Sequence, residues 1–126
     1  MPRVIHFEIP AKNPPQLAAF YKEVFGWEVN KWEGGEQPYW LVKTGEEGTP
    51  GIDGGLFPPE GPFTGVINTI DVPDVDAFVS KVKANGGQVV LDKMPVPGVG
   101  WLVYCKDVEG TIFGMMQGDP AAGNGQ

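Results

Sequence analysis

Residues 13–26, NPPQLAAFYKEVFG, decide the fold of this chain because they carry a complete helix signal. Asn13 belongs to the residue types that cap helix N-termini, and the two prolines after it suit the first helical turn. The apolar side chains that follow are spaced i, i+3, i+4, i+7 and i+8, which places them on one face of a helix. Gly26 ends the pattern. The stretch predicts an amphipathic helix with the apolar residues Leu17, Phe20, Tyr21, Val24 and Phe25.

Short stretches rich in β-branched and aromatic residues surround this helix. Residues 4–9, VIHFEI, precede it and alternate as strand residues do. Residues 27–32 and 39–44 indicate two more strands, and the glycine-rich residues 51–57 indicate a weaker fourth. The first half of the chain therefore has the order β-α-β-β-β.

The second half repeats this order. Residues 66–72 predict a strand, Asp74 a helix cap, and residues 88–91, 101–106 and 111–117 three further strands. Between them, Val75, Phe78, Val79 and Val82 give the same helical spacing, and Gly86 and Gly87 end it. Equivalent landmarks lie 61 positions apart from the first strand through the helix, as Gly26 and Gly87 show (87 − 26 = 61). Coincident caps, stripes and stops predict an internal repeat of one βαβββ unit.

The repeat sets the expected organisation of the chain. The first βαβββ module spans residues 1–57 and the second spans residues 64–117. A Pro-rich connector, residues 58–63, joins them, and residues 118–126 form a tail that we expect to be flexible. A length of 126 residues fits one structural domain that contains both modules.

Composition excludes several classes of function. The formal charge is −7 and no basic stripe occurs, so nucleic acid is not an expected partner. No apolar run approaches the roughly 20 residues of a membrane-spanning helix, so a membrane is not expected either. The start of the sequence has no signal-peptide pattern, and the single cysteine has no partner for an internal disulfide. We therefore expect a cytoplasmic protein that binds a small molecule.

Two stretches are fairly specific to one group of proteins. Residues 20–27, FYKEVFGW, and residues 107–114, DVEGTIFG, resemble the glyoxalase/bleomycin-resistance/extradiol-dioxygenase superfamily, also called vicinal oxygen chelate proteins. The match extends over nearly the whole chain up to Gln117. The resemblance implies an α+β fold in which two tandem βαβββ modules form curled mixed sheets around a cup. It also implies a homodimer.

Metal-binding members of this superfamily carry four ligands, on the first and last strands of each module. His6 stands at the ligand position of the first strand, and its counterpart 61 residues later is Ile67. On the last strand of the second module, the resemblance implies a ligand position four residues after the glycine of the Asp-x-x-Gly turn, residues 107–110, which is Gly114. Its apolar neighbours Phe113 and Met115 would then face the helix, which supports this placement. In the first module the position is Gly54 or Gly55. Transition metals need three or four N, O or S donors and the chain has one histidine, so we expect no metal cofactor.

The expected site residues follow from strand alternation, because every second residue faces the same side. His6 and Glu8 share one face, and we take them as the catalytic candidates, with His6 either a general base or a relic hydrogen-bonded in a polar cup. The candidate ligand-binding residues are Thr69, Asp71, Trp101, Ile112 and Met116. Trp101, Val103 and Cys105 alternate with Leu102 and Tyr104, and the sequence leaves open which set faces the cup.

Three functions are compatible with this pattern. The first is a metal-independent small-molecule site, for binding or for lyase- or isomerase-type chemistry with His6 as the base. The second is sequestration of a cationic drug, as in bleomycin-resistance proteins, suggested by the acidic balance and the four tryptophans. The third is a metal-dependent lyase or dioxygenase, which the resemblance favours and the ligand positions oppose. Whether the protein is an enzyme stays open, although a glyoxalase I or extradiol dioxygenase of the usual kind is not expected.

Overall fold

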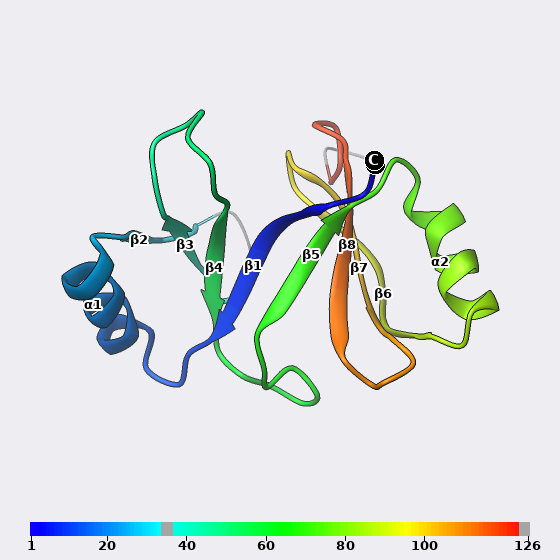
Figure 1. Cartoon of the computed structure of the whole chain (residues 1–126), viewed down its shortest axis with the longest axis horizontal. Helices are drawn as coiled ribbons and strands as arrows, with labels where there is room; N and C mark the ends of the chain where they lie inside the picture. The colour runs from blue at the N-terminus through cyan, green and yellow to red at the C-terminus, as the bar shows by residue number, and fades with distance from the viewer. Residues whose placement is uncertain (34–36, 124–126) are drawn as a thin grey trace. The chain divides into compact units, whose positions relative to one another are not determined.

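The computed structural model describes residues 1–33 and 37–123 and has an α+β fold with the predicted order of elements (Figure 1). Each half of the chain is a βαβββ module, as expected. The first module contains β1 (Val4–Pro10), α1 (Pro14–Phe25), β2 (Glu28–Lys31), β3 (Trp40–Lys43) and β4 (Asp53–Phe57). The second contains β5 (Ile67–Asp71), α2 (Val75–Ala84), β6 (Gln88–Val96), β7 (Gly100–Lys106) and β8 (Ile112–Gly118).

The chain divides into two compact units. The first unit is residues 5–66, and the second unit is residues 1–4 together with residues 67–126. This division nearly follows the two modules, with the first four residues grouped with the second module.

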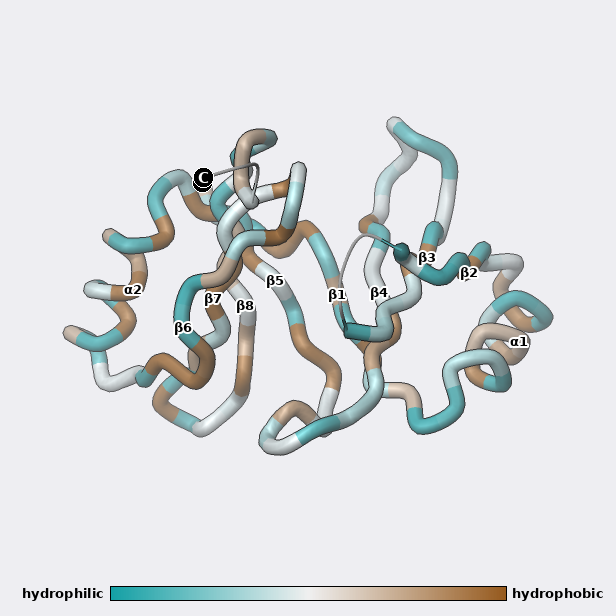
Figure 2. The backbone as a smooth tube through the Cα atoms, turned by 180° about the vertical axis from the view of Figure 1, so that it is seen from behind, coloured by the Kyte–Doolittle hydropathy of each residue, from teal (hydrophilic) through white to brown (hydrophobic). Residues whose placement is uncertain are grey.

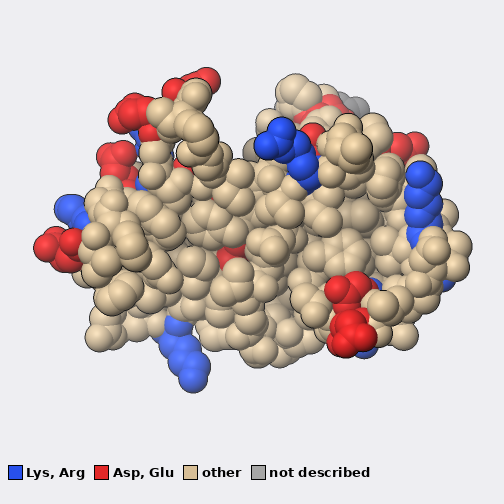
Figure 3. Space-filling view, in the orientation of Figure 1, with Lys and Arg blue, Asp and Glu red and all other residues tan. Residues whose placement is uncertain are grey.

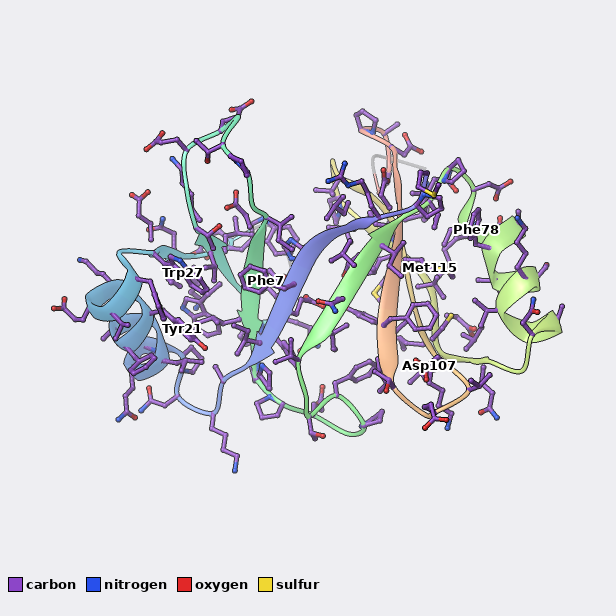
Figure 4. The ribbon with its side chains drawn as sticks, in the orientation of Figure 1. Phe7, Tyr21, Trp27, Phe78, Asp107 and Met115 are labelled. Carbon is purple, nitrogen blue, oxygen red and sulfur yellow. The ribbon has the colours of Figure 1, made fainter. Side chains whose placement is uncertain are left out.

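In the first unit, the strand order is β2-β3-β4-β1. The first and last strands of the module are parallel neighbours, whereas β2, β3 and β4 pair antiparallel. The buried centre lies on the face toward α1 and consists of Ala11, Val42 and Leu56, with Phe7, Ile9, Leu17, Ala18, Trp27, Val29 and Trp40 packed against it. The rings of Tyr21 and Trp27 stack at 4.8 Å between centroids, and Phe7 packs on Trp27 from the strand side (Figure 4).

The second unit has the same plan with a larger core. Its strand order is β5-β8-β7-β6, with β5 and β8 parallel and the remaining pairs antiparallel. Met115 on β8 belongs to the buried cluster, and Phe78 on α2 packs against that cluster (Figure 4). The full buried set is Val72, Val75, Val103, Cys105 and Met115, and Phe113 packs against it. The prediction that Phe113 and Met115 face the helix is therefore confirmed.

The predicted helix signals form the helix ends. The Asn13 side chain accepts a hydrogen bond from the Gln16 backbone N–H at 3.2 Å, and Gly26 has a left-handed φ of 77°. Asp74 accepts two such bonds, from the N–H groups of Asp76 and Ala77 at 3.0 and 3.2 Å. Helix α1 nevertheless contains no buried residue: Phe20, Val24 and Phe25 of its apolar stripe are more than half exposed.

Two regions differ from the expected boundaries. Strand β6 continues to Val96, five residues beyond its expected end, and passes through Pro95. It lies at the edge of the strand order, where the absent proline N–H costs no ladder bond. The described part of the tail is also ordered by contacts, because Ala122 is fully buried and its carbonyl accepts from Gly98 N–H at 3.1 Å.

Hydrophilic residues dominate the loop between β3 and β4 (Figure 2). Acidic side chains gather on this loop, in keeping with the net charge of −7 (Figure 3). Among residues 1–33 and 37–123, no helix is long and apolar enough to cross a membrane.

Candidate functional site

The polar face of the first unit is opposite the face that packs on α1. Along β1, Phe7 and Ile9 pack against the core, so His6 and Glu8 point to the other side. The parallel register of β1 with β4 pairs His6 with Asp53 and Glu8 with Gly55. This register brings one imidazole and two carboxylates to the same face.

His6 has a direct hydrogen-bond partner. Its Nε2 lies 2.7 Å from the hydroxyl of Tyr39, the residue immediately before β3. The Tyr39 backbone carbonyl accepts from Trp32 N–H at 2.8 Å, and the Trp32 ring meets the Tyr39 ring edge-on at 6.0 Å between centroids. Tyr39 is therefore held from both its backbone and its ring.

The electrostatics of His6 combine burial with two negative neighbours. Burial lowers the pKa of the His6 imidazole below its ordinary value, and the carboxylates of Glu8 and Asp53 offset part of that effect. The neutral imidazole therefore prevails at pH 7 and has a lone pair to accept a proton. Once protonated, the same ring would lie between two carboxylates that favour the cation.

The two carboxylates are positioned differently. Glu8 is buried, with 7% of its surface exposed. Asp53 begins β4, and its Oδ1 accepts hydrogen bonds from the Thr44 backbone N–H at 2.9 Å and from the Thr44 hydroxyl at 3.2 Å. Asp53 and Tyr39 were not among the predicted site residues, because nothing in the linear pattern gives the register of β4 against β1.

Gly55 is the glycine that shares the face of His6. The register pairs Glu8 with Gly55 in the first module and Thr69 with Gly114 in the second, and Glu8 and Thr69 are themselves 61 residues apart. Gly55 and Gly114 are thus equivalent, 59 positions apart (114 − 55 = 59), which resolves the choice between Gly54 and Gly55. A Cβ atom added at Gly55 would overlap the hydroxyl and ring of Tyr39.

The second unit brings four of its five candidate residues to one face. Thr69 pairs with Gly114 and Asp71 with Met116, so Thr69, Asp71 and Met116 lie on the side away from the core, and alternation puts Ile112 with them. Thr69 is 3% exposed, whereas Asp71 is exposed at the end of β5. The face is mainly apolar, and Ile67 stands on it at the position equivalent to His6.

Trp101 does not share that face. Its ring packs against the core cluster toward α2, together with Val103 and Cys105. The Trp101 Nε1–H donates to Asp119 Oδ2 at 3.1 Å, and the Lys93 ammonium lies 5.4 Å from a ring centroid of Trp101. The expectation that Trp101 lines the ligand face is therefore corrected, because Leu102 and Tyr104 are the strand residues that point away from the core. Burial raises the pKa of the Cys105 thiol, which keeps it protonated.

The metal site typical of the resembled superfamily does not fit these residues. Within the described ranges, no group of three or more His, Cys, Asp or Glu side chains is arranged to hold a metal ion. The Nε2 atom of His6 is hydrogen-bonded to the Tyr39 hydroxyl, and the glycine at position 55 has no side chain that could bind a metal. These residues therefore do not fit a metal-dependent step.

A separate hollow lies in the first unit. It has a volume of about 760 Å³ and lies where β1 leads into α1, and it includes neither His6 nor Glu8. Its lining is Pro10, Ala11, Lys12, Asn13, Gln16, Leu17, Phe20, Pro59 and Thr64. No titratable cluster lines this hollow, so the chemical candidates remain at His6.

Comparison with known proteins gives consistent matches. The family model described as "Glyoxalase/Bleomycin resistance protein/Dioxygenase superfamily" matches residues 3–113. A Mycobacterium bovis protein named "Putative glyoxylase CFP32" is 31% identical over 118 residues, which cover 90% of this chain and 43% of that protein. The chain thus spans less than half the length of that relative.

Two further matches extend over most of both chains. A glyoxylase-like domain-containing protein of Didymella fabae is 30% identical over 113 residues, 82% of this chain and 84% of that one. Among solved structures, methylmalonyl-CoA epimerase from Mycobacterium tuberculosis superposes with a TM-score of 0.70 over 93% of this chain and 88% of that chain. At 14% identity this last similarity shows the shared fold alone.

Proposed function

Because the chain belongs to the glyoxalase/bleomycin resistance protein/dioxygenase superfamily, we propose that it binds a small carbonyl compound and moves a proton on it without a metal, with His6 as the base. The observation that carries the proposal is the His6 imidazole, which is neutral at rest, hydrogen-bonded to Tyr39 and faced by two carboxylates. The reaction class is isomerisation or lyase-type cleavage that begins at a C–H bond beside a carbonyl.

The electrostatics support a base that works near neutral pH. A general base must be unprotonated at rest and must hold the proton once it has taken it. Burial supplies the first property, and Glu8 and Asp53 supply the second because they stabilise the imidazolium. Glu8 therefore acts on the ligand through His6 and is a positioning residue.

The proposed chemistry transfers protons only, so it needs no oxidant or reductant. The C–H bond beside the carbonyl breaks and its electron pair stays on the ligand as an enolate. The imidazole of His6 gains a proton and becomes an imidazolium. Return of the proton to the other face of the same carbon, or to a neighbouring atom, completes an isomerisation. The fold shared with an epimerase is compatible with this class.

Within the second unit taken by itself, we further propose that Thr69, Asp71, Ile112 and Met116 form a ligand-contacting face. Their common face carries two buried or half-buried apolar side chains and a hydroxyl, which is a composition typical of small-molecule sites. The expected homodimer and cytoplasmic location remain predictions.

The test is exchange of carbon-bound hydrogen with solvent. The protein is incubated in D₂O with a panel of 2-oxo acids, hemithioacetals and acyl thioesters, and mass spectrometry follows deuterium incorporation. We expect exchange with at least one member, and a fall of about 100-fold or more in His6→Gln. Ile67→Val, at the equivalent position of the second module, is the matched control and should change the rate by less than about threefold, since it alters one methyl group.

Three results would contradict the proposal. Equal exchange by His6→Gln and the wild type would remove His6 from the chemistry. Binding of a panel member without any exchange would replace catalysis by sequestration. Neither binding nor exchange across the panel would overturn the assignment of a carbonyl ligand.

A further inference from the structure

We propose that the Tyr39 hydroxyl is the group through which His6 exchanges protons with the ligand, and that glycine at position 55 is what admits this hydroxyl to the site. The inference deepens the proposed function and rests on it for its catalytic consequence. The Tyr39–His6–Gly55 arrangement itself is testable without any substrate.

Tyr39 occupies space that another side chain would otherwise fill. A Cβ atom at position 55 would overlap both the hydroxyl and the ring of Tyr39, so the ring crosses β4 directly above Gly55. From there the hydroxyl reaches Nε2 of His6 at 2.7 Å. The phenol thus takes the place of a residue-55 side chain on the strand position that is equivalent to Gly114.

The second module shows that a glycine alone does not produce this arrangement. A Cβ atom at Gly114 would approach the Thr69 hydroxyl at 2.9 Å and the Tyr104 ring at 3.4 Å. The residue equivalent to Tyr39, two positions before the residue that pairs with the glycine, is Leu102. The second module therefore has a filled glycine position but no phenol facing an imidazole.

The direction of the hydrogen bond follows from the acidities of its partners. A phenol is a stronger acid than the N–H of a neutral imidazole, so the shared proton resides on the Tyr39 oxygen and Nε2 accepts. His6 then carries its own proton on Nδ1. Because the Nε2 lone pair already accepts the hydrogen bond from Tyr39, a proton reaches Nε2 from the Tyr39 hydroxyl and not directly from the ligand.

The proposed step conserves atoms and electrons. The ligand C–H bond breaks and its proton bonds to the Tyr39 oxygen, while the Tyr39 O–H bond breaks and that proton bonds to Nε2. The C–H electron pair remains on the ligand as the enolate, and His6 becomes an imidazolium beside Glu8 and Asp53. The reverse movement restores both residues.

The substrate-free test uses the single histidine of the chain, whose imidazole gives one pair of ¹⁵N resonances. In the wild type we expect the Nδ1–H tautomer, with the Nε2 shift of a hydrogen-bonded acceptor. Tyr39→Phe keeps the ring and removes the hydroxyl, so the population should shift toward the Nε2–H tautomer that free imidazole side chains favour. Gly55→Ala should produce the same shift with Tyr39 still present, because the added methyl group displaces the hydroxyl.

Gly118→Ala is the matched control, since Gly118 also lies in a strand and a Cβ there meets nothing within 4 Å. It should leave the His6 resonances unchanged. Circular dichroism of each variant separates displacement of Tyr39 from loss of the fold. If Gly55→Ala does not fold, Tyr39→Phe alone decides: unchanged ¹⁵N shifts in Tyr39→Phe would overturn the inference.

The kinetic test uses the exchange reaction of the proposed function. Tyr39→Phe should lose about as much activity as His6→Gln, on the order of 100-fold, and the double variant should lose no more than either single one, because the two residues act as a unit. Loss in His6→Gln with full activity in Tyr39→Phe would overturn the relay and leave the proposed function standing. A tautomer shift in Tyr39→Phe without exchange on any compound would confirm the Tyr39–His6 contact and overturn the proposed function.

Discussion

The two modules share one architecture but carry different chemistry on the face away from their helices. In the first, His6, Glu8 and Asp53 share that face with the Tyr39 hydroxyl. In the second, the positions of His6 and Glu8 hold Ile67 and Thr69, and the face is mainly apolar. On the faces that pack against the helices, the second module has the larger cluster of buried apolar residues.

This contrast separates what the fold needs from what the site needs. Caps, apolar alternation and the parallel pairing of first and last strands recur in both halves and suffice for a βαβββ module. The titratable cluster occurs in one half only, so the fold does not require it. Residues that a repeat leaves unmatched are therefore the better candidates for function.

The largest expected effect on stability comes from truncating matched core valines. Val42 is 2% exposed in the smaller core of the first module, and Val103 is 1% exposed in the larger core of the second. Each change to alanine should cost about 2 to 4 kcal/mol, with Val103→Ala the more costly because Val103 belongs to the larger cluster of buried residues, which we expect to relax less around a cavity. Urea unfolding measures both, and a greater loss in Val42→Ala would contradict the comparison of the two cores.

Removal of the helix caps should have the next largest effect. Asp74 accepts two backbone hydrogen bonds, at 3.0 and 3.2 Å, and carries a negative charge at the start of α2, whereas Asn13 accepts one bond, at 3.2 Å, and is neutral. We expect Asp74→Ala to cost about 1 to 2 kcal/mol and Asn13→Ala about 0.5 to 1 kcal/mol. Chemical denaturation of the two variants checks the order, which equal losses would refute.

Replacing the surface lysines Lys93 and Lys43 should change stability by less than removing the helix caps. Lys93 of the second module lies 3.1 Å from Asp76 and above the Trp101 ring, whereas Lys43 of the first is 3.9 Å from Glu28. Solvent screens both pairs, since all four side chains are more than a third exposed. We expect Lys93→Met to cost about 0.5 to 1 kcal/mol and Lys43→Met about 0.3 kcal/mol or less. Thermal melts at low and high salt give both values, and a larger loss in Lys43→Met would contradict the expectation.

The pH dependence tests the imidazole of the first module. Burial lowers the folded-state pKa of His6, so the unfolded chain binds the proton more readily. The contribution of His6 to stability is therefore constant above the ordinary histidine pKa of about 6.5 and is lost as pH falls from there through the folded-state pKa. The facing groups Glu8, Asp53 and Tyr39 remain in His6→Gln, so the difference between the two unfolding curves isolates the imidazole. If the wild type instead became more stable relative to His6→Gln as pH fell, the pKa of His6 would be raised in the folded state and the prediction would be wrong.

Much of the fold could be predicted from the sequence, because helix caps and strand alternation are local signals. Asn13, Asp74 and Gly26 have the expected roles, and the parity that placed Met115 toward the helix is confirmed. The end of β6 was missed because Pro95 normally stops a strand, and the edge position that tolerates it is a property of the whole sheet.

The site was predictable only in part. Strand periodicity identified His6 and Glu8 as sharing a face, but Asp53 and Tyr39 meet His6 through strand pairing that no local pattern encodes. The direction of Trp101 was also undetermined, because residues 101–105 are apolar on both faces of β7. Packing against α2 selects the face, and α2 is distant in sequence.

The parallel pairing of β1 with β4 also fixes when the site can form. His6 and Asp53 are register partners 47 positions apart (53 − 6 = 47), and the strands between them pair only with near neighbours. Closing that long segment is the slow, entropically costly step of the module, whereas α1 and the β2–β3 pair depend on shorter loops. Asp53 therefore joins His6 and Glu8 late as the chain folds, and a nascent chain that ends before residue 53 would hold His6 and Glu8 without their β4 partners.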